Sequence, residues 1–301
     1  MDKNNENTIP SVALITVNYN GYDFLKDGIL SLSKMSGVNI KIFIIDNASS
    51  DDSIKSIEGM FNNLEVIKLS ENTGFAKANN IGIERAIEQG YEYSLIVNND
   101  VIVDKRMLSQ LLKYADEDTI TIPKIYYYDN KKLIWSAGGY IDKKTGEAKH
   151  RGIREEDIGQ YDELYLSQVA TGCCMLINNK IFKTIGMFDE NYFMYCEDTD
   201  LCMRIVDKGY KILYVPTAKL WHKVSSSSGG ESSAFKVYYI ARNKLYLTSK
   251  FKDKIKLSAR LYVRVKLLIL LMLSIVYKKK NRNIYNAYID YKSKKMGRKA
   301  E

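Results

Sequence analysis

Four short apolar runs, each ending in polar residues, limit the folds open to this chain of 301 residues. The runs are rich in β-branched and aromatic residues, as buried strands are. They lie at residues 12–17, 40–45, 64–67 and 93–97. Helical spacing of apolar residues or capping signals predict helices at residues 22–35, 50–61 and 74–90. Strands that alternate with helices across short links predict an α/β fold with a mostly parallel sheet covered by helices.

The polar residues after these strands are expected at one edge of the sheet, because parallel sheets bind ligands at the carboxyl ends of their strands. They are NYNG at 18–21, DNASSD at 46–51 and NND at 98–100. Asp46 can accept hydrogen bonds from a nucleobase or ribose, but capping of the next helix explains it equally well. Asp100 can hold a hard divalent cation through oxygen, but Asn and Asp are also common in turns.

A second acidic segment, YCEDTDLCMR at residues 195–204, places three carboxylates within four residues beside aromatic and apolar neighbours. If a helix begins here, Asp198 and Asp200 lie near its positive end, which favours their charged form. An ionised carboxylate beside an acceptor can remove a proton from a hydroxyl; helix capping is the alternative explanation. His222 follows a later strand, and a lone histidine is more often structural than a ligand, unless Asp100 holds a metal close to it.

Charge is distributed unevenly between the body of the chain and its tail. Residues 241–301 contain 18 lysines and arginines against three acids, whereas the whole chain has a net charge of +9. The rest of the chain is therefore mildly acidic, and such a split indicates a tail that meets an anionic surface. Four cysteines without zinc-site spacing indicate reduced thiols in the cytosol. The polar start of the chain lacks the features of a signal peptide.

The tail contains an apolar stretch, Leu267–Tyr277, that is too short to cross a bilayer. It has 11 residues, whereas a spanning helix needs about 20. Arg264 and Lys266 precede it and Lys278–Lys280 follow it. We therefore expect residues 251–301 to form a basic amphipathic helical tail that lies on an anionic membrane surface. Packing of this helix on the body, or on a second subunit in a homodimer, is the alternative.

Seven motifs in order give the sequence a resemblance to family 2 inverting glycosyltransferases, and among them to the rhamnosyltransferase-like branch that builds polysaccharides. The motifs are LITVNYNG, IIDNASSDDS, ENTGFAKANNIGI, LIVNNDV, ATGCCMLI, GMFDENYFMYCEDTDLCMR and LWHKVSSSSG. The resemblance covers residues 10–250 and implies the GT-A fold. In this fold a nucleotide-binding half (10–120) and an acceptor-binding half (121–250) share one mixed, mostly parallel sheet. Residues 1–9 precede it as a disordered tail.

The resemblance also implies roles for individual positions. Asp198 resembles the catalytic base. Asp100 and His222 resemble the ligands of a divalent cation, Mg²⁺ or Mn²⁺. The residues implied in nucleotide-sugar binding are Val17, Asn18, Asp46, Gly74, Lys77, Asn99 and Asp100, with Asp46 reading the base. Those implied on the acceptor side are Trp135, Gly138, Gly139 and Glu197. Arg242 recurs in similar proteins without a role that we can assign.

The resemblance implies transfer of a sugar, with inversion, from a nucleotide diphosphate sugar to a hydroxyl of a glycan or lipid-linked glycan. The favoured donor is dTDP-rhamnose, and UDP-linked galactose, galactofuranose or N-acetylglucosamine are the alternatives. One position departs from the family pattern, because Asn98 stands where a full DXD motif has an acid. Amide variants occur in the rhamnosyltransferase-like branch, but the amide lowers the charge at the metal. The enzyme is expected in the cytoplasm, at the inner face of the cell membrane.

Three other functions compete with this one. A sugar-1-phosphate nucleotidyltransferase would carry a glycine-rich N-terminal loop with basic residues, which LITVNYNG lacks. A non-catalytic descendant that binds nucleotide sugars or glycans agrees with Asn98, but not with retention of Asp100, Asp198 and His222. Nucleic-acid binding by the tail is disfavoured, because its lysines flank an apolar block instead of alternating with stacking aromatics.

Overall fold

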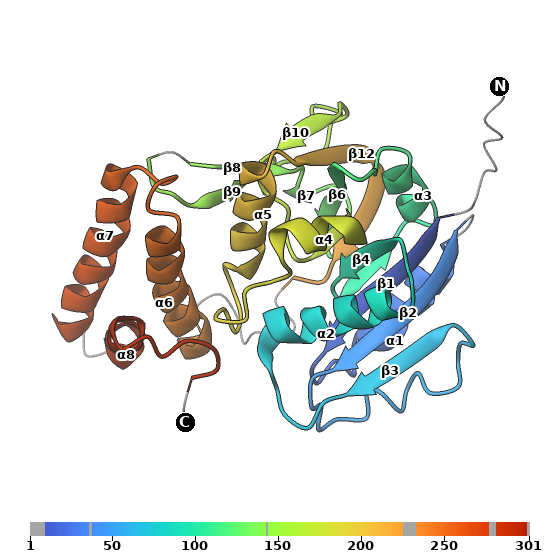
Figure 1. Ribbon diagram of the computed structural model, residues 1–301, viewed down its shortest axis with the longest axis horizontal. Coiled ribbons are helices and arrows are strands. Elements are labelled where there is room, and N and C mark those ends of the chain that lie inside the picture. Colours follow the sequence, from blue (N-terminus) through green and yellow to red (C-terminus); the bar gives the residue numbers. More distant parts are fainter. Residues whose placement is uncertain (1–9, 36–37, 143, 225–232, 277–280, 300–301) are drawn as a thin grey trace.

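One large sheet organises the protein in the computed structural model, which describes residues 10–35, 38–142, 144–224, 233–276 and 281–299 (Figure 1). Its strands run in the order β10–β12–β6–β11–β4–β1–β2–β3. Their bounds are β1 (Ser11–Asn18), β2 (Asn39–Asp46), β3 (Leu64–Lys68), β4 (Tyr93–Val97), β6 (Thr119–Tyr127), β10 (Tyr165–Ser167), β11 (Cys174–Asn178) and β12 (Lys211–His222). The strands β4, β1, β2 and β3 are parallel, β11 is antiparallel to both of its neighbours, and β12 is parallel to β6. The predicted α/β class with a mixed, mostly parallel sheet is confirmed.

The register of the sheet brings the carboxyl ends of β1, β2 and β4 to one edge. Asn18 at the end of β1 pairs with Asp46 at the end of β2. The β1–β4 register pairs Ile15 with Ile96, so Asn99, which follows β4, comes level with Asn18. The polar residues after these strands therefore lie together, as the sequence predicts.

Helices cover both faces of the sheet. The helices α2 (Gly74–Glu88), α4 (Asn179–Ile185) and α5 (Glu197–Asp207) contribute to the apolar core on one face. The helices α1 (Leu25–Ser33) and α3 (Met107–Leu112) contribute to the core on the other face. Gly82 lets α2 approach β1 closely, since a Cβ there would lie 2.4 Å from Ile15 Cγ2.

The helix predicted at residues 50–61 is wrong, because this segment forms turns and bends. Its polar side chains bond to nearby backbone. Asp51 accepts hydrogen bonds from the N–H groups of Tyr22 at 3.0 Å and Ser53 at 3.1 Å, and Ser56 Oγ donates to Ser53 O at 2.6 Å. Such bonds offer the backbone an alternative to a helix.

Four short strands complete the half of the molecule that follows β4. They are β5 (Val101–Val103), β7 (Ile134–Ser136), β8 (Gly139–Ile141) and β9 (Ala148–His150). β5 pairs with the end of β12, β7 pairs with β6, and β8 and β9 form a separate two-stranded sheet.

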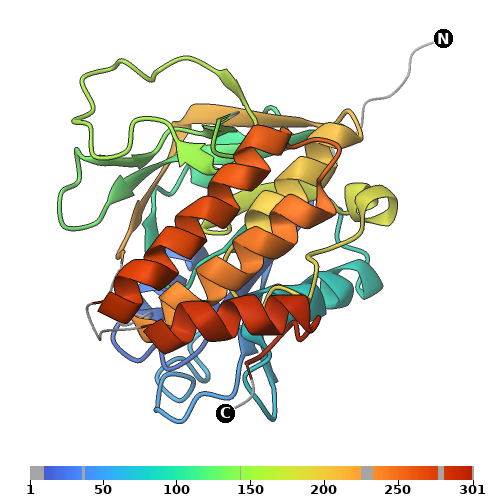
Figure 2. The same cartoon turned by 90° about the vertical axis from the view of Figure 1, so that its left-hand side faces the viewer.

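Three C-terminal helices form a layer beside the α/β body (Figures 1 and 2). They are α6 (Ala234–Lys250), α7 (Leu257–Val276) and α8 (Asn281–Lys292). α6 lies between the body and α7, and α8 crosses one end of both helices. Tyr238 of α6 donates a hydrogen bond to Asp290 of α8 at 2.7 Å. After α8 the chain returns to the body, where Gly297 N donates to Asn191 O at 2.8 Å.

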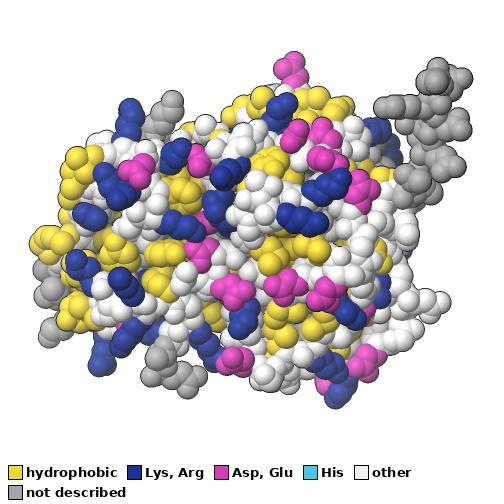
Figure 3. Space-filling view, viewed as in Figure 1, with side chains coloured by type: hydrophobic (Ala, Val, Ile, Leu, Met, Phe, Trp, Pro, Cys, Tyr) yellow, Lys and Arg dark blue, Asp and Glu magenta, His cyan; other side chains and the backbone are white. Residues whose placement is uncertain are grey.

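Within the described ranges, none of the helices is sufficiently long and apolar to pass through a membrane. α7 nevertheless carries an exposed apolar face, which we call the α7 apolar face. It consists of Leu261, Val265, Leu268, Ile269 and Met272, each about half exposed. Lysine and arginine side chains are interspersed with apolar ones over the C-terminal helices (Figure 3). Tyr277, the last residue of the predicted apolar stretch, and the flanking Lys278–Lys280 lie outside the described residues.

Candidate active site

Asn18 joins the ends of three strands. Its side chain is fully buried, and its Nδ2 lies 3.3 Å from Asp46 Oδ1 and 2.9 Å from Ser53 Oγ. Its Oδ1 accepts a hydrogen bond from Asn99 Nδ2 at 2.9 Å. Val17 packs against the core on the α2 side. These contacts fix Asp46 at the sheet edge, and the roles of the four predicted residues in nucleotide binding stay predictions.

Asp100 and His222 lie side by side at the same edge, although they are far apart in sequence. β5 pairs with the end of β12 so that His222 lies opposite Val101. This pairing brings His222 Nε2 to 3.1 Å from Asp100 Oδ1, and both side chains are buried. Asn98 Nδ2 lies 3.4 Å from the same imidazole nitrogen. The fold thus brings together the two predicted metal ligands.

Trp135 contacts both histidines of the chain. Its ring centroid lies 5.0 Å from that of His222, edge to face, and 4.9 Å from that of His150. His222 Nδ1 makes no hydrogen bond to any described residue, so packing on Trp135 orients this imidazole. His150 Nδ1 lies 3.1 Å from Ser136 Oγ. Burial lowers the pKa of His150, against the opposing effect of the nearby Asp198 charge.

The position of His150 is not predicted from the sequence, where it lies in a polar stretch. It arises from the pairing of β8 with β9, which sets Gly139 opposite His150. A Cβ at Gly139 would lie 2.4 Å from Lys149 O, and Gly138 has a φ of +80°. In the sequence, only the adjacent Gly138 and Gly139 could have indicated this close contact between β8 and β9. The predicted role of the two glycines in acceptor binding stays a prediction.

Asp198 lies in the first turn of α5 and is partly exposed. Its Oδ1 accepts a hydrogen bond from Thr199 N at 2.6 Å, and its Oδ2 accepts one from Gly172 N at 3.2 Å. Both oxygens are therefore oriented by backbone donors.

The segment Gly172–Cys173 connects Asp198 to the region of Asp100. Gly172 bonds to Asp198, and Cys173 O accepts a hydrogen bond from Asn98 N at 3.0 Å. Burial, and then the neighbouring charge of Asp100, raises the pKa of the Cys173 thiol well above its usual range. Two consecutive residues thus connect the predicted base to the segment that carries the predicted metal ligand Asp100.

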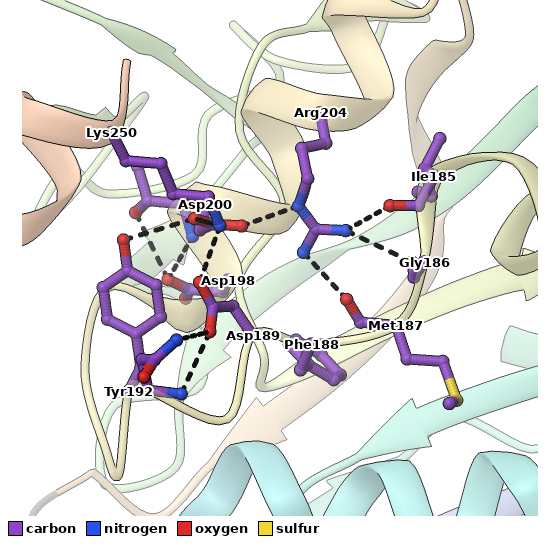
Figure 4. Close-up of polar contacts among 12 residues, drawn as sticks. Ile185, Gly186, Met187, Phe188, Asp189, Tyr192, Asp198, Asp200, Arg204 and Lys250 are labelled. Atoms are coloured by element: carbon purple, nitrogen blue, oxygen red, sulfur yellow. Dashed lines mark hydrogen bonds and ion pairs between the residues drawn. The ribbon is translucent and has the colours of Figure 1, made fainter. Parts of the chain in front are cut away.

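Unlike Asp198, Asp200 has contacts that indicate a role in stabilising the fold (Figure 4). Its fully buried carboxylate accepts hydrogen bonds from Arg204 Nε at 2.7 Å and Tyr192 Oη at 3.2 Å, and pairs with Lys250 Nζ at 2.6 Å. Arg204 also donates to three backbone carbonyls of residues 185–187. These contacts tie the loop before α5 to that helix.

Three other predicted residues lie on α2 and at the start of α5. Glu197 is buried, and burial together with the Asp198 charge raises its pKa well above the usual range. Gly74 has a φ of +83°, and a Cβ there would lie 2.3 Å from Phe193 O, so this glycine is required by a protein contact. Lys77 is exposed near the start of α2. Their roles in acceptor and donor binding stay predictions.

Helix α6 fixes the turn that precedes Asp198. Tyr195 and Cys196 have φ values of +70° and +72°, in the left-handed region that residues other than glycine rarely adopt. Asn243 Nδ2 donates hydrogen bonds to Met194 O and Tyr195 O, both at 2.8 Å. These bonds hold an unfavourable backbone conformation in place.

Arg242, which has no assigned role from the sequence, is a fully buried anchor on α6. Its Nη1 donates to Gly297 O at 2.7 Å and its Nη2 donates to Asn191 O at 3.4 Å. It therefore joins the C-terminal segment to the loop that leads to α5.

The residues at the sheet edge fit a divalent cation. Mg²⁺ is usually held by one or two carboxylates together with substrate phosphates and water, and His222 adds an imidazole nitrogen beside Asp100. The described part of the chain contains no group of three or more His, Cys, Asp or Glu residues suited to a metal. The remaining ligands would therefore come from phosphate oxygens and water.

A family profile and several known relatives match the sequence. The profile of "Glycosyl transferase family 2" matches residues 13–186, more than half of the chain. The chain is 25% identical over 240 residues to "dTDP-rhamnosyl transferase RfbF" of Shigella flexneri, covering 76% of this chain and 77% of that protein. It is 24% identical over 250 residues to "N-acetylglucosaminyl-diphospho-decaprenol L-rhamnosyltransferase" of Mycobacterium tuberculosis (strain ATCC 25618 / H37Rv), covering 73% and 78%.

Solved structures share the fold. The mannosyltransferase PcManGT from Pyrobaculum calidifontis, in complex with GDP-Man and Mn²⁺, has a TM-score of 0.59 at 13% identity, covering 94% of this chain and 87% of that one. GalNAc-T7 with UDP, GalNAc and Mn²⁺ has a TM-score of 0.61 at 17% identity, and the likeness covers 79% of this chain and 51% of that one. The predicted GT-A fold is confirmed.

Proposed function

The chain belongs to glycosyl transferase family 2 and is a nucleotide-sugar glycosyltransferase, and on this premise we propose that it transfers the sugar with inversion to a hydroxyl of a glycan acceptor. One observation carries the proposal. Asp198 accepts a hydrogen bond from Gly172, and the next residue, Cys173, accepts one from Asn98, which lies two residues before the Asp100–His222 pair. The Asp100–His222 pair suits a departing diphosphate and Asp198 suits an incoming hydroxyl.

Asp198 is the proposed general base. Its carboxylate takes the proton of the acceptor hydroxyl while the hydroxyl oxygen bonds to the anomeric carbon. The bond between that carbon and the nucleotide diphosphate breaks on the opposite face, so a single displacement inverts the anomeric centre. The N–H groups of Gly172 and Thr199 orient the carboxylate for this step.

Asp100 and His222 are the proposed ligands of Mg²⁺ or Mn²⁺. When bound, such an ion neutralises negative charge on the leaving diphosphate. Trp135 orients His222 by packing, and Asn98 contributes an amide where a second carboxylate would add charge.

Asn243 is a proposed positioning residue, because it holds the turn that precedes Asp198. Asn243→Asp is expected to lower kcat by roughly 10-fold or more, since even a small displacement of the Asp198 carboxylate slows the reaction. The change keeps the side-chain size but sets a carboxylate against two carbonyl oxygens. Nucleotide-sugar affinity should stay near the wild-type value, since α6 is not part of the strand-end network. Asn286→Asp, the same change on α8, is the matched control. Equal losses of kcat in the two variants would argue against the positioning role.

The proposed donor is dTDP-rhamnose. This choice is supported by relatives named as rhamnosyltransferases, among them the Shigella flexneri and Mycobacterium tuberculosis proteins. UDP-sugars are the alternative, since S. aureus TarS, with a TM-score of 0.52, was solved in complex with UDP-GlcNAc.

A thermal-shift panel of nucleotide sugars with Mn²⁺ tests the function, because a ligand of the folded state raises stability by mass action. We expect dTDP-rhamnose to raise Tm more than UDP-sugars do, and Asp46→Ala to abolish the rise. In a transfer assay with a glycan acceptor, dTDP-rhamnose should likewise be a better donor than the UDP-sugars. A protein whose Tm responds to no nucleotide sugar, and that transfers none, would overturn the proposal.

The acceptor is proposed to be a glycan carried on a lipid, with the enzyme peripheral at the inner face of the membrane. The Mycobacterium tuberculosis relative is named for a diphospho-decaprenol acceptor. The α7 apolar face is exposed on a strongly basic tail, and each basic residue near an anionic surface contributes about 1 kcal/mol.

Binding to vesicles that contain phosphatidylglycerol tests the membrane contact. The double change Leu268→Ser and Ile269→Ser should weaken binding by at least ~10-fold, because apolar burial contributes about 25 cal/mol per Å². Ile158→Ser with Leu166→Ser is the control, since these residues are 82% and 62% exposed on the α/β body. If both double variants bind like the wild type, α7 does not hold the protein on the membrane.

A further inference from the structure

An apolar groove with lysines at its rim lies between α6 and α7. Each helix contributes one face to it. The apolar lining consists of Val237, Ile240 and Ala241 of α6, Val263, Leu267 and Leu270 of α7, and Ile284 of α8. Lys236, Lys244, Lys266 and Glu147 complete the lining, and the groove has a volume of about 190 Å³.

The rim has an excess of positive charge. Glu147 pairs with Lys244 at 2.6 Å, with Lys266 at 3.3 Å and with Lys149 at 3.3 Å. Burial would raise the pKa of Glu147, but the bonds to Lys244 and Lys266 lower it to about 2, so the carboxylate is charged at neutral pH. One negative charge balances only one of these three lysines, and Lys236 adds a further cation.

Two sets of contacts place the rim of the groove near the proposed base. Lys236 Nζ lies 5.9 Å from the ring centroid of Tyr195, which comes three residues before Asp198. Glu147 immediately precedes strand β9, which ends at His150. The charge of Asp198 acts on the pKa of His150, so His150 lies close to the proposed base. At about 3.3 Å per strand residue, the Cα atoms of Glu147 and His150 are about 10 Å apart. A hexose and the diphosphate attached to it span a comparable distance.

We propose that this groove binds the polyprenyl diphosphate of the acceptor, with its diphosphate on Lys236, Lys244 and Lys266 and its first isoprene units against the apolar lining. The inference rests on the proposed function, which places the acceptor hydroxyl at Asp198. Charge complementarity selects this occupant, because a neutral lipid would leave the excess lysine charge unpaired. The groove holds only the start of a polyprenyl chain, so the rest of the chain must extend beyond the groove toward the bilayer.

Calorimetric binding of farnesyl diphosphate to the full chain, in EDTA to remove metal-assisted binding at the donor site, tests the groove. The double change Lys236→Gln and Lys266→Gln should weaken binding by at least ~10-fold, as loss of charge-assisted bonds does. Leu270→Ser should weaken it as well, and farnesol and inorganic diphosphate should each bind less tightly than farnesyl diphosphate. Lys208→Gln with Lys211→Gln, two exposed lysines that lie just after α5 and at the start of β12, should bind like the wild type. Unchanged binding in both groove variants would overturn the inference.

Kinetics with two acceptors separate this inference from the proposed function. The lysine double variant should raise KM for a polyprenyl-diphosphate-linked sugar by at least ~10-fold, while KM for a simple glycoside of that sugar stays unchanged. If the wild type transfers sugar and the variant does not alter KM for the lipid-linked acceptor, the groove inference fails alone. If farnesyl diphosphate binds as expected but the wild type transfers no sugar to either acceptor, the proposed function fails and the groove site remains.

Discussion

Asp198→Asn is expected to lower kcat by at least ~10²-fold, the effect typical of a lost general base. The amide keeps the shape of the carboxylate but cannot take the proton of the acceptor hydroxyl. Affinity for the nucleotide sugar should remain near the wild-type value, because Asp198 is anchored by Gly172 and Thr199, whereas the proposed donor residues Asn18 and Asp46 contact each other at the strand ends. Single-turnover transfer and donor titrations measure the two quantities separately. Near-normal turnover would refute the assignment of the base.

Asp200→Asn is the matched control, since it makes the same chemical change two residues away. Its carboxylate is fully buried and pairs with Arg204 and Lys250. Breaking such a buried ion pair costs about 3 kcal/mol of unfolding free energy, so this variant should lose stability. Its kcat per folded molecule should fall much less than that of Asp198→Asn. The opposite pattern would exchange the roles of the two carboxylates.

Asp100→Asn is expected to reduce kcat by more than ~10²-fold and to remove the response of activity to Mn²⁺. The loss corresponds to several kcal/mol of charge stabilisation on the leaving diphosphate. Calorimetric titration of the nucleoside diphosphate with and without Mn²⁺ should show that the variant no longer gains affinity from the metal.

Asp104→Asn serves as the comparison for this prediction. Asp104 is a partly exposed carboxylate just after β5 that accepts a hydrogen bond from Arg106 N at 2.8 Å, so its loss should leave the metal response intact. An Asp100→Asn enzyme with the wild-type Mn²⁺ dependence would contradict the proposed metal site.

The sheet and its functional edge were predictable because local patterns determine them. Apolar runs of strand length define β1, β2 and β4, and parallel pairing brings Asn18, Asp46 and Asp100 to one edge. The turns at residues 50–61 were missed because side-chain bonds of Asp51 and Ser56 compete with the helix. Ser and Asp both cap helices and form such local bonds, so the sequence alone does not distinguish the two structures.

Long-range contacts account for the rest of the site. His150 reaches Trp135 only through the β8–β9 pairing, and no local pattern marks that register. Likewise, the roles of Arg242 and Asn243 depend on backbone carbonyls of a loop about 50 residues earlier. Backbone carbonyls carry no sequence signature, so such anchors are visible only in the folded chain.

The attachment of Gly297 to Asn191 and Arg242 has a practical consequence for handling the protein. Gly297 and Arg242 brace the loop that leads to α5, so an affinity tag or reporter inserted close to Gly297 would strain the segment that carries Asp198. A reporter inserted near Ser11 would instead lie at the opposite end of β1 from Asn18, and so away from the strand-end residues.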